Sequence, residues 1–535
     1  MGAHFIGVDV GTGSARAGVF DGAGKSLAAA SHPIRIWRPH PLHAEQSSAD
    51  IWQAVCASVR KAIADAAIEP GSVAGIGFDA TCSLVVLDGS GNSLAVNAEG
   101  EAERDIILWM DHRARGQAER INTAGAHVLD YVGGRISPEM ETPKLLWLAE
   151  NLPDTFAKAG HFLDLADFLT WRSSGSLIRS TCTVTCKWTY LAHEKRWDSA
   201  YFDRIGLGSL SAADFARIGA HIADPSTRLG AGLTEQAAAE LGLRVGTPVA
   251  TGIIDAHAGA VGTLGAKNLP GALEDRLAYV FGTSACTLNV TKDPVFVPGV
   301  WGPYYSALIP GLWLNEGGQS AAGAAMDYLI RLHPNAGRIE EKARAAGISP
   351  IQYLEQQARE LLEARAFPDI VKGLHIVPEF IGNRAPFADP DARAVIAGLG
   401  LDDDETSLVR LYLAGTASIG YGLRQILDAL AGKGTTISTV VVSGGAARSA
   451  LVRRILADAA NITIASVDTD EPVLLGSAML AAVAAGHVRE ISDAMMTMSS
   501  AHELLEPDPR YLAVHAQRYA AFQDLQAAYR QCRAV

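Results

Sequence analysis

Cysteine is scarce in this chain, and the few cysteines are scattered. The sequence has 535 residues and six cysteines, which are Cys56, Cys82, Cys182, Cys186, Cys286 and Cys532. A disulfide framework is typical of short secreted chains with closely spaced, paired cysteines, so we expect reduced thiols here. Cys182 and Cys186 have no second cysteine pair or histidine pair at zinc spacing, and a zinc site is therefore not predicted.

Basic residues and long apolar runs are also in short supply. The 45 Lys and Arg residues stand against 58 Asp and Glu residues, a net charge of -13, which disfavours nucleic acid as a partner. The most apolar late run, Val473 to Ala485, includes Gly476 and Ser477 and is shorter than the roughly 20 residues that span a bilayer. The first residues lack the basic flank and apolar stretch of a signal peptide. We expect a cytoplasmic protein with no membrane role.

Two common nucleotide-binding motifs are missing. No Gly-x-x-x-x-Gly-Lys-Ser/Thr sequence occurs, which excludes a P-loop. The run Gly11-Thr12-Gly13 resembles the start of a dinucleotide fingerprint, but Arg16 stands where a third glycine would open a helix, and the following residues have the pattern of a strand. A Rossmann dehydrogenase is therefore a distant alternative.

A strand, a glycine turn and a second strand occur twice. The first copy spans 6–21 around Gly11-Thr12-Gly13, and the second spans 277–290 around Gly282-Thr283-Ser284. One such turn is more often an ordinary hairpin, but its repetition in the same setting favours a shared role. Glycines let backbone amides approach an anion, and Thr and Ser hydroxyls add donors. Two facing hairpins could hold a polyphosphate, as a phosphotransferase requires.

Length and composition predict two large domains. With 48% hydrophobic residues, the chain has enough apolar material for two cores. We place an N-terminal domain at 1–266, a linker region at 267–275, a C-terminal domain at 272–486 and a helical tail at 487–535 that packs on the body. Near the end, a strand at 439–442 leads through Ser443-Gly444-Gly445 into a helix and another strand, and a helix N-terminus after a strand favours anionic ligands.

Four segments together resemble the FGGY carbohydrate kinases of the actin and hexokinase ATPase superfamily. They are Gly77–Asp88, Trp109–Ala114, Cys186–Tyr190 and Ile254–Gly259, and the resemblance runs nearly end to end. The four segments resemble one subgroup of this family most closely, and that subgroup is associated with phosphorylation of D-ribulose. The resemblance implies an α/β fold in which two RNase H-like domains flank a catalytic cleft, with ATP and Mg²⁺ as cofactors.

The residues and the resemblance together suggest roles for individual side chains. Asp255 follows an apolar strand, where it could accept a sugar hydroxyl proton; an N-cap role is the alternative, and the resemblance favours catalysis. His257 is interpreted as a structural histidine. The resemblance implies that Asp9 holds Mg²⁺ through water, with a turn-capping role as the alternative.

The resemblance also assigns the substrate contacts. The ATP phosphates are expected at Thr12, Gly13, Ser14, Arg16, Gly282, Thr283 and Ser284. Gly444, Gly445 and Arg448 are expected at the adenosine end, with a simple tight turn as the alternative, and Gln319 at either substrate. The sugar is expected at Cys82, Lys187, Asp255 and Glu316, with Asp111 and His112 as weaker candidates. From exposure statistics alone, Lys187 and Glu316 would be a solvated charge and a helix-entry carboxylate. Glu141 departs from the family, which usually has Pro, Ser or Thr there.

The resulting hypothesis is ATP-dependent phosphorylation of a ketopentose, most specifically D-ribulose at O5. Ribitol, L-ribulose and D-xylulose are alternative substrates that the sequence separates poorly. A sugar sensor without catalysis is disfavoured, because there is no DNA-binding segment and both Asp9 and Asp255 are present. The expected partners are the sugar and ATP, and a homodimer is left open.

Overall fold

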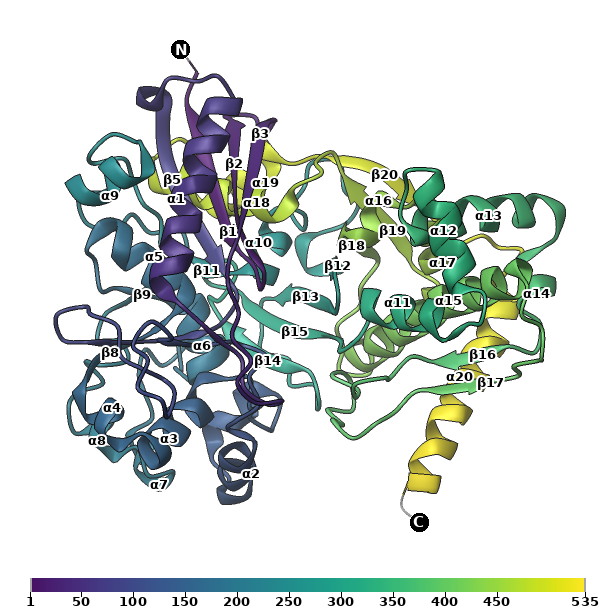
Figure 1. The fold of residues 1–535 in the computed structure, drawn as a ribbon, viewed down its shortest axis with the longest axis horizontal. Helices are drawn as coiled ribbons and strands as arrows, with labels where there is room; N and C mark the ends of the chain where they lie inside the picture. The colour runs from purple at the N-terminus through teal and green to yellow at the C-terminus, as the bar shows by residue number, and fades with distance from the viewer. Residues whose placement is uncertain (1, 534–535) are drawn as a thin grey trace.

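Two mixed β-sheets organise the chain, one in each lobe of the computed structural model (Figure 1). The structure describes residues 2–533, so position 1 and positions 534–535 of the expected domains lie outside the described residues. The first sheet has the order β11-β5-β1-β2-β3. Its strands are β1 (His4–Val10), β2 (Ser14–Asp21), β3 (Ser26–Pro33), β5 (Val73–Ala80) and β11 (Ile253–Ile254).

The second sheet repeats this arrangement. Its order is β14-β15-β13-β12-β18-β19-β20, formed by β12 (Arg276–Phe281), β13 (Ala285–Thr291), β14 (Trp301–Tyr305), β15 (Trp313–Gln319), β18 (Thr439–Gly444), β19 (Thr463–Val467) and β20 (Ala501–Leu505). Five strands of each sheet follow the same pattern, in the orders β3-β2-β1-β5-β11 and β15-β13-β12-β18-β19. Among the first three strands of each order, neighbours are antiparallel, and the last two strands run parallel to the third, β1 or β12. The expected two-lobed α/β architecture is confirmed.

Local sequence patterns account for the elements beside the first sheet. Helix α1 (Ser48–Asp65) begins where the Ser47 side chain accepts a hydrogen bond from the Asp50 N–H. The four-residue spacing of Ile51, Val55 and Val59 produces its buried face. Both predicted glycine hairpins are present, as β1-β2 and β12-β13.

Helix α18 (Pro472–Ala484) comes late in the chain but packs on the first sheet. It contacts β1, β5 and α10 (Asp255–Val261), and Figure 1 shows it in yellow among the purple strands. Glycines allow this approach: a Cβ at Gly7 would lie 1.9 Å from the Leu474 carbonyl oxygen, and one at Gly77 would lie 2.1 Å from that of Ser477. The late helix α18 therefore packs directly against the backbone of β1 and β5.

The other elements cover the two sheets or form small sheets of their own. In the N-terminal half they are β4 (Glu45–Gln46), β6 (Leu84–Asp88), β7 (Ile106–Ile107), α2 (Arg115–Ala124), α3 (Glu141–Asn151), α4 (Pro153–Lys158), β8 (Ala159–Asp164), α5 (Leu165–Ser174), β9 (Arg179–Ser180), α6 (Thr181–Trp188), α7 (Ser199–Arg204), α8 (Gly208–Ser211), β10 (Ile222–Ala223) and α9 (Glu235–Leu241). Later come α11 (Gly323–Leu332), α12 (Ala336–Ala345), α13 (Pro350–Ala364), α14 (Phe367–Ile370), β16 (His375–Val377), β17 (Val395–Ala397), α15 (Glu405–Ala431), α16 (Gly445–Arg448), α17 (Ala450–Ala460), α19 (Ile491–Met498) and α20 (Leu512–Arg533). Across residues 2–533, no helix combines the length and apolar character needed to cross a membrane.

Candidate active site

Three aspartates meet where the parallel strands of the first sheet end. Asp9 on β1 lies opposite Asp79 on β5, and Asp79 in turn lies opposite Ile253 on β11. Asp255 follows β11 and is the first residue of α10. Ligands of parallel α/β sheets bind beyond the carboxyl ends of the strands, so this edge is the candidate reaction centre.

Asp9 is held by the neighbouring strand. Arg16 lies directly opposite it on β2, and the Arg16 Nε donates to an Asp9 carboxylate oxygen over 2.8 Å. The Arg16 Nη1 donates over 2.8 Å to Glu471, just before α18. Arg16, which we expected at the ATP phosphates, therefore bridges two carboxylates in this structure, and its phosphate contact stays a prediction.

Asp79 is fully buried and was not among the predicted site residues. Its Oδ2 accepts a hydrogen bond of 2.6 Å from the Ser477 hydroxyl, whereas its Oδ1 has no partner within the part of the chain that the structure describes. Burial raises the pKa of Asp79 well above its usual range, and the nearby Asp9 raises it further. The segment that contains Asp79 was recognised in the sequence, but only the strand register shows that this side chain faces Asp9.

Asp255 has the environment of a proton acceptor rather than a helix cap. Ile254, not Asp255, occupies the N-cap position of α10. Among the described residues, the Asp255 carboxylate accepts one hydrogen bond, of 2.7 Å, from the Ala256 N–H. Burial, followed by the charge of Asp9, raises the pKa of Asp255 to about 6. A carboxylate with a raised pKa is a stronger base than an ordinary aspartate and is still ionised at neutral pH.

Lys187 and Glu316 form a buried ion pair between the lobes. Lys187 on α6 lies 3.4 and 3.3 Å from the two carboxylate oxygens of Glu316 on β15, and the two residues are only 3% and 4% exposed. Burial alone raises the pKa of Glu316, but Lys187 and His257 outweigh it and hold the pKa at about 2. The alternatives from exposure statistics therefore do not hold: Lys187 is not a solvated charge, and Glu316 lies within β15 rather than at the start of a helix.

Three further residues complete this polar region and were missed in the sequence. The Lys187 Nζ lies 4.5 Å from the centre of the Trp301 ring, and the guanidinium of Arg384 lies 5.6 Å from the same ring. Tyr304 is fully buried, and its hydroxyl has no hydrogen-bond partner among residues 2–533. Arg384 comes from the loop between β16 and β17, which carries no recognisable motif, and Tyr304 lies on β14, outside the segments that resemble the family.

The remaining sugar candidates differ in what occupies their polar atoms. Cys82, half-buried between β5 and β6, lies close enough to Lys187 for its charge to act on the thiol pKa, which burial raises. Asp111 is buried and accepts hydrogen bonds from Arg113 and from the Ala44 N–H, so its carboxylate is already satisfied. His112 is half-exposed and lies 3.5 Å from Glu139.

Glu141, the departure from the family pattern, pairs with a cation of its own helix. Its carboxylate lies 3.4 Å from the Lys144 Nζ on α3, and both side chains are fully buried. Burial raises the pKa of Glu141 to about 7. The extra carboxylate thus interacts locally with Lys144.

The two glycine hairpins present open turns. Gly13, Gly282 and Thr283 are exposed, and a hydrogen bond within each turn closes it: Gly11 N–H to Ser14 over 3.1 Å and Gly282 N–H to Ser284 over 2.8 Å. The Thr12 hydroxyl accepts a hydrogen bond of 3.0 Å from the Trp109 indole, which fixes the first turn to the Trp109–Ala114 segment. The Gly282 and Thr283 carbonyls accept hydrogen bonds from residues 322–324, so a ligand would meet the exposed N–H side of this turn.

The predicted adenosine residues lie beside the second hairpin. Gly444 pairs with Phe281 in the β12-β18 register, and its φ of +76° suits glycine. Gly444 and Arg448 line a pocket of about 420 Å³ at the ends of β18 and β19. Gln319 lies on β15, where its side chain accepts from Tyr279 over 2.5 Å and donates to the Ile419 carbonyl over 3.0 Å, so its contact with substrate stays a prediction.

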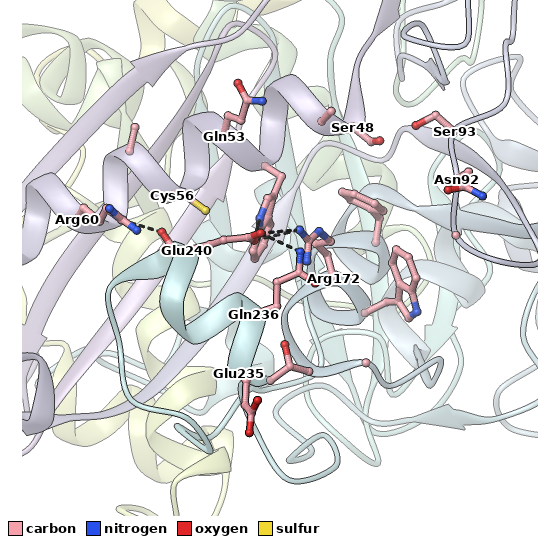
Figure 2. A pocket seen from close by; sticks show the side chains of 18 residues that line it. Ser48, Gln53, Cys56, Arg60, Asn92, Ser93, Arg172, Glu235, Gln236 and Glu240 are labelled. Atoms are coloured by element: carbon pink, nitrogen blue, oxygen red, sulfur yellow. Dashed lines mark hydrogen bonds and ion pairs between the residues drawn. The ribbon is translucent and has the colours of Figure 1, made fainter.

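A wider pocket, of about 1130 Å³, lies away from these residues between α1, α5 and α9 (Figure 2). Glu240 is at its centre and accepts hydrogen bonds from Trp52 over 2.6 Å and from Arg172 over 3.0 Å. None of the predicted site residues lines it. Its central polar groups pair with one another, so size alone does not make it the reaction site.

Comparison with known proteins identifies the protein family. Residues 4–262 match the N-terminal domain and residues 277–485 the C-terminal domain of the FGGY family of carbohydrate kinases. The chain is 42% identical over 527 residues to the human FGGY carbohydrate kinase domain-containing protein, covering 97% of this chain and 95% of the human one. It is 39% identical over 512 residues to a D-ribulokinase of Saccharomyces cerevisiae, covering 90% and 72%.

The fold comparison agrees. A ligand-bound xylulose kinase from Lactobacillus acidophilus superposes with a TM-score of 0.80 at 19% identity, covering 98% of each chain. The aspartates, the paired hairpins and the duplicated sheets thus occur in a chain that matches both domains of this family, at residues 4–262 and 277–485. The protein belongs to the FGGY family of carbohydrate kinases.

Proposed function

We propose that this kinase transfers the γ-phosphoryl group of ATP to a ketopentose, and that the substrate is D-ribulose, phosphorylated at O5. The observation that carries the proposal is the buried Lys187–Glu316 pair, which supplies charged donors and acceptors for sugar hydroxyls in the region of Asp255. The yeast relative named D-ribulokinase supports this choice of sugar. Sugar hydroxyls need such partners because unpaired polar groups in a closed site are costly.

The chain's own groups account for the movement of the proton. A substrate hydroxyl within hydrogen-bond reach of Asp255 gives its proton to a carboxylate oxygen as the hydroxyl oxygen bonds to the γ-phosphorus. The bond from that phosphorus to the ADP oxygen breaks at the same centre, and ADP leaves. Asp255 can accept the proton because its carboxylate is held by only one backbone N–H among the described residues.

The acidic edge of the first sheet fits Mg²⁺. Its donors are all carboxylate oxygens, the ligands that this hard cation prefers, and the buried Asp79 Oδ1 lacks a partner within residues 2–533. Asp9 would hold the ion through water, as we expected from the sequence. Bound Mg²⁺ neutralises charge on the phosphate oxygens.

The hairpins suit the nucleotide. Gly13 of the first turn and Gly282 and Thr283 of the second are exposed and would contact the phosphates, with Thr12, Ser14 and Ser284 beside them. Gly444, Gly445 and Arg448 would contact adenosine next to the second turn. We assign most of the sugar contacts, Asp255 and the first hairpin to the domain at 1–266. The second hairpin and the adenosine site belong to the domain at 272–486, which also supplies Glu316.

The pKa of Asp255 predicts an acid limb in the pH profile. Because burial and Asp9 raise this pKa to about 6, the carboxylate is protonated below that pH and cannot accept a proton. We expect kcat/KM for the sugar to rise with pH through an apparent pKa near 6 and to lose about tenfold for each pH unit below it. Initial rates between pH 5 and 8 at constant ionic strength test this, and a profile flat down to pH 5 would contradict it.

Substrate preference is the direct test of the proposed sugar. We expect kcat/KM for D-ribulose to exceed that for D-xylulose, L-ribulose and ribitol by at least about tenfold, or roughly 1.4 kcal/mol. The wrong stereocentre leaves a buried polar group such as Glu316 unpaired, which weakens the transition state. A coupled assay of ADP release across the four compounds measures the ratios. A preference for any of the other three would overturn the assignment.

A further inference from the structure

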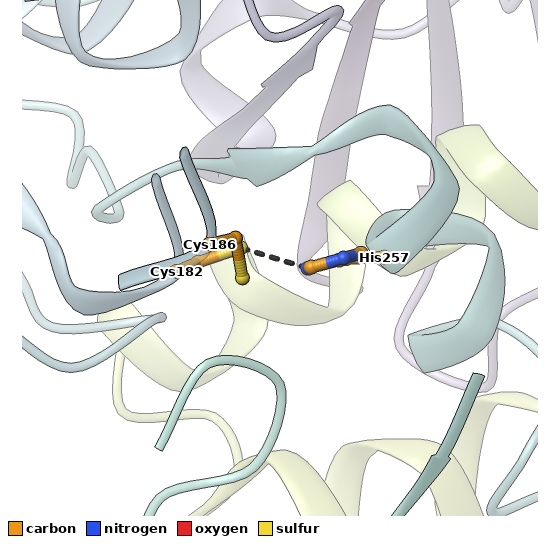
Figure 3. Close-up of side chains that lie close together, drawn as sticks. All are labelled: Cys182, Cys186 and His257. Carbon is orange, nitrogen blue, oxygen red and sulfur yellow. Dashed lines mark hydrogen bonds between the residues drawn. The ribbon is translucent and has the colours of Figure 1, made fainter. Parts of the chain in front are cut away.

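A row of buried polar side chains leads from α6 through α10 to the sugar-binding pair. The Cys182 Sγ lies 3.0 Å from the His257 Nδ1, and the His257 Nε2 lies 3.3 Å from the Glu316 Oε2. Glu316 in turn pairs with Lys187. Figure 3 shows Cys182 and Cys186 together on one side of His257, with the dashed contact between the two elements. Cys182 and His257 are both fully buried.

The two carboxylate oxygens of Glu316 have different numbers of hydrogen-bond partners in this row. The Glu316 Oε2 faces both His257, at 3.3 Å, and Lys187, at 3.3 Å, whereas Oε1 has only Lys187, at 3.4 Å, among the described residues. A carboxylate oxygen can accept about two hydrogen bonds, so Oε1 keeps capacity for a substrate hydroxyl. The orientation of Glu316 therefore depends on the ring of His257.

The ring of His257 is in turn oriented from its other side. Its Nδ1 meets Cys182, and its backbone lies in α10, two residues after Asp255. Without Cys182 the imidazole would lose the partner that fixes its rotation, and one ring nitrogen would be left buried and unpaired. In other proteins too, the hydrogen bond that one ring nitrogen makes determines the protonation of the other nitrogen.

Alternating charge reinforces the row. Burial alone lowers the pKa of His257, but Cys182 and Glu316 outweigh it and raise the pKa to about 10. Burial alone raises the pKa of Cys182, whereas its contacts with Cys186 and His257, and the Ile254 N–H, lower it. The other ionisable groups acting on these residues are Asp164 and Asp167 near Cys182, Asp255 near His257, and Arg384 beside Glu316. The contacts along the row thus favour the ionised forms of Cys182, His257, Glu316 and Lys187, in alternating sign.

We propose that Cys182 and His257 are positioning residues that orient Glu316 toward the sugar, which gives this chain a thiol-anchored substrate site. The proposal rests on the proposed role of Glu316 in binding the ketopentose. Neither side chain contacts the reacting atoms. Their effect reaches the sugar through the Glu316 carboxylate and reaches ATP hardly at all.

A bound metal ion is the competing explanation of the same cluster. Possible ligand atoms of Cys182, Cys186 and His257 all lie within 4.8 Å of one another. Structural zinc sites have four ligands, and within residues 2–533 this cluster offers three. The close Sγ···Nδ1 contact is already a hydrogen bond between the two groups, which favours the positioning role.

Steady-state kinetics of Cys182→Ala test the proposal, with Cys182→Ser as the conservative variant and Cys56→Ala as the matched control. Cys56 lies on α1 beside the pocket of Figure 2 and has no contact with the row. We expect Cys182→Ala to raise KM for the sugar at least about tenfold, while KM for ATP stays within about twofold. Cys182→Ser should recover part of the loss, because its hydroxyl can still pair with the His257 Nδ1. An unchanged KM for ATP shows that the variant is folded.

Two further measurements distinguish the positioning role from a purely structural role and from a bound metal ion. The ultraviolet absorbance of a thiolate should be present in the parent protein at pH 7, absent from Cys182→Ala and retained in Cys56→Ala. An unchanged sugar KM in Cys182→Ala, or the absence of the thiolate signal from the parent protein, would overturn the proposal. So would one zinc ion per chain, measured by elemental analysis, that Cys182→Ala loses. If the parent protein does not phosphorylate D-ribulose, the proposed sugar fails, and the KM comparison is made with whichever pentulose or pentitol it accepts.

Discussion

Asp255→Asn is expected to lower kcat by roughly two to four powers of ten while leaving KM for sugar and ATP largely intact. The amide has the shape of the carboxylate and can keep the hydrogen bond from the Ala256 N–H, but it cannot accept the hydroxyl proton. The variant should also lose the acid limb near pH 6, because that limb belongs to Asp255. Rapid-quench and steady-state assays with saturating substrates measure the effect.

A matched surface change controls for this result. Asp65→Asn alters an exposed carboxylate whose contact is the Lys61 ammonium on the same helix, and turnover should stay near that of the parent protein. If Asp255→Asn turned over at a near-normal rate, Asp255 would be removed from the mechanism. A loss of sugar binding instead of turnover would make it a binding residue.

Lys187→Met is expected to lower kcat/KM for the sugar by roughly two to three powers of ten. Removing one partner of a buried ion pair typically lowers the stability of the protein by about 3–5 kcal/mol, because the other charge is left uncompensated. Here that charge is Glu316, only 4% exposed, whose low pKa depends first on Lys187. The slow hydrolysis of ATP without sugar should change little, because the proposed role of Lys187 is at the sugar and not at the nucleotide.

The chain offers a contrasting ion pair as a control. Lys292 and Glu274 lie 2.9 Å apart, but the Lys292 side chain is 78% exposed, so Lys292→Met should have little effect on either activity. The double variant Lys187→Met with Glu316→Gln should retain more folded protein than Lys187→Met alone, because it leaves no unpaired charge. Near-normal use of sugar by Lys187→Met would contradict the assignment of the sugar site.

Local sequence patterns indicate those parts of the fold that depend on neighbouring residues, such as turns and amphipathic helices. The two glycine hairpins were visible because turn residues interrupt apolar strands at matching places. In the same way, the spacing of Ile51, Val55 and Val59 accounts for the buried face of α1. The resemblance then supplied Asp255, Lys187 and Glu316, and the sequence alone could not show that Lys187 and Glu316 are buried. Exposure statistics failed for Lys187 because they do not include the partner that neutralises it.

Other features depend on contacts between distant segments. Arg384 reaches the Trp301 ring from a loop without a motif, and Asp79 meets Asp9 only through the register of β1 and β5. Cys182 and His257 are separated by 75 residues, and cysteine spacing alone gave no reason to pair them. Such residues become neighbours through packing, so periodicity and motif length carry no signal for them.

In the proposed reaction, Asp255 accepts the proton of a ketopentose hydroxyl. A crystal structure of the protein with D-ribulose, Mg²⁺ and a non-hydrolysable ATP analogue decides whether it can. We expect the O5 hydroxyl about 3 Å from the Asp255 carboxylate, a Glu316 oxygen on another sugar hydroxyl, and the γ-phosphate between Gly13 and Thr283. A sugar bound with no hydroxyl in reach of Asp255, or a nucleotide bound away from both hairpins, would contradict it.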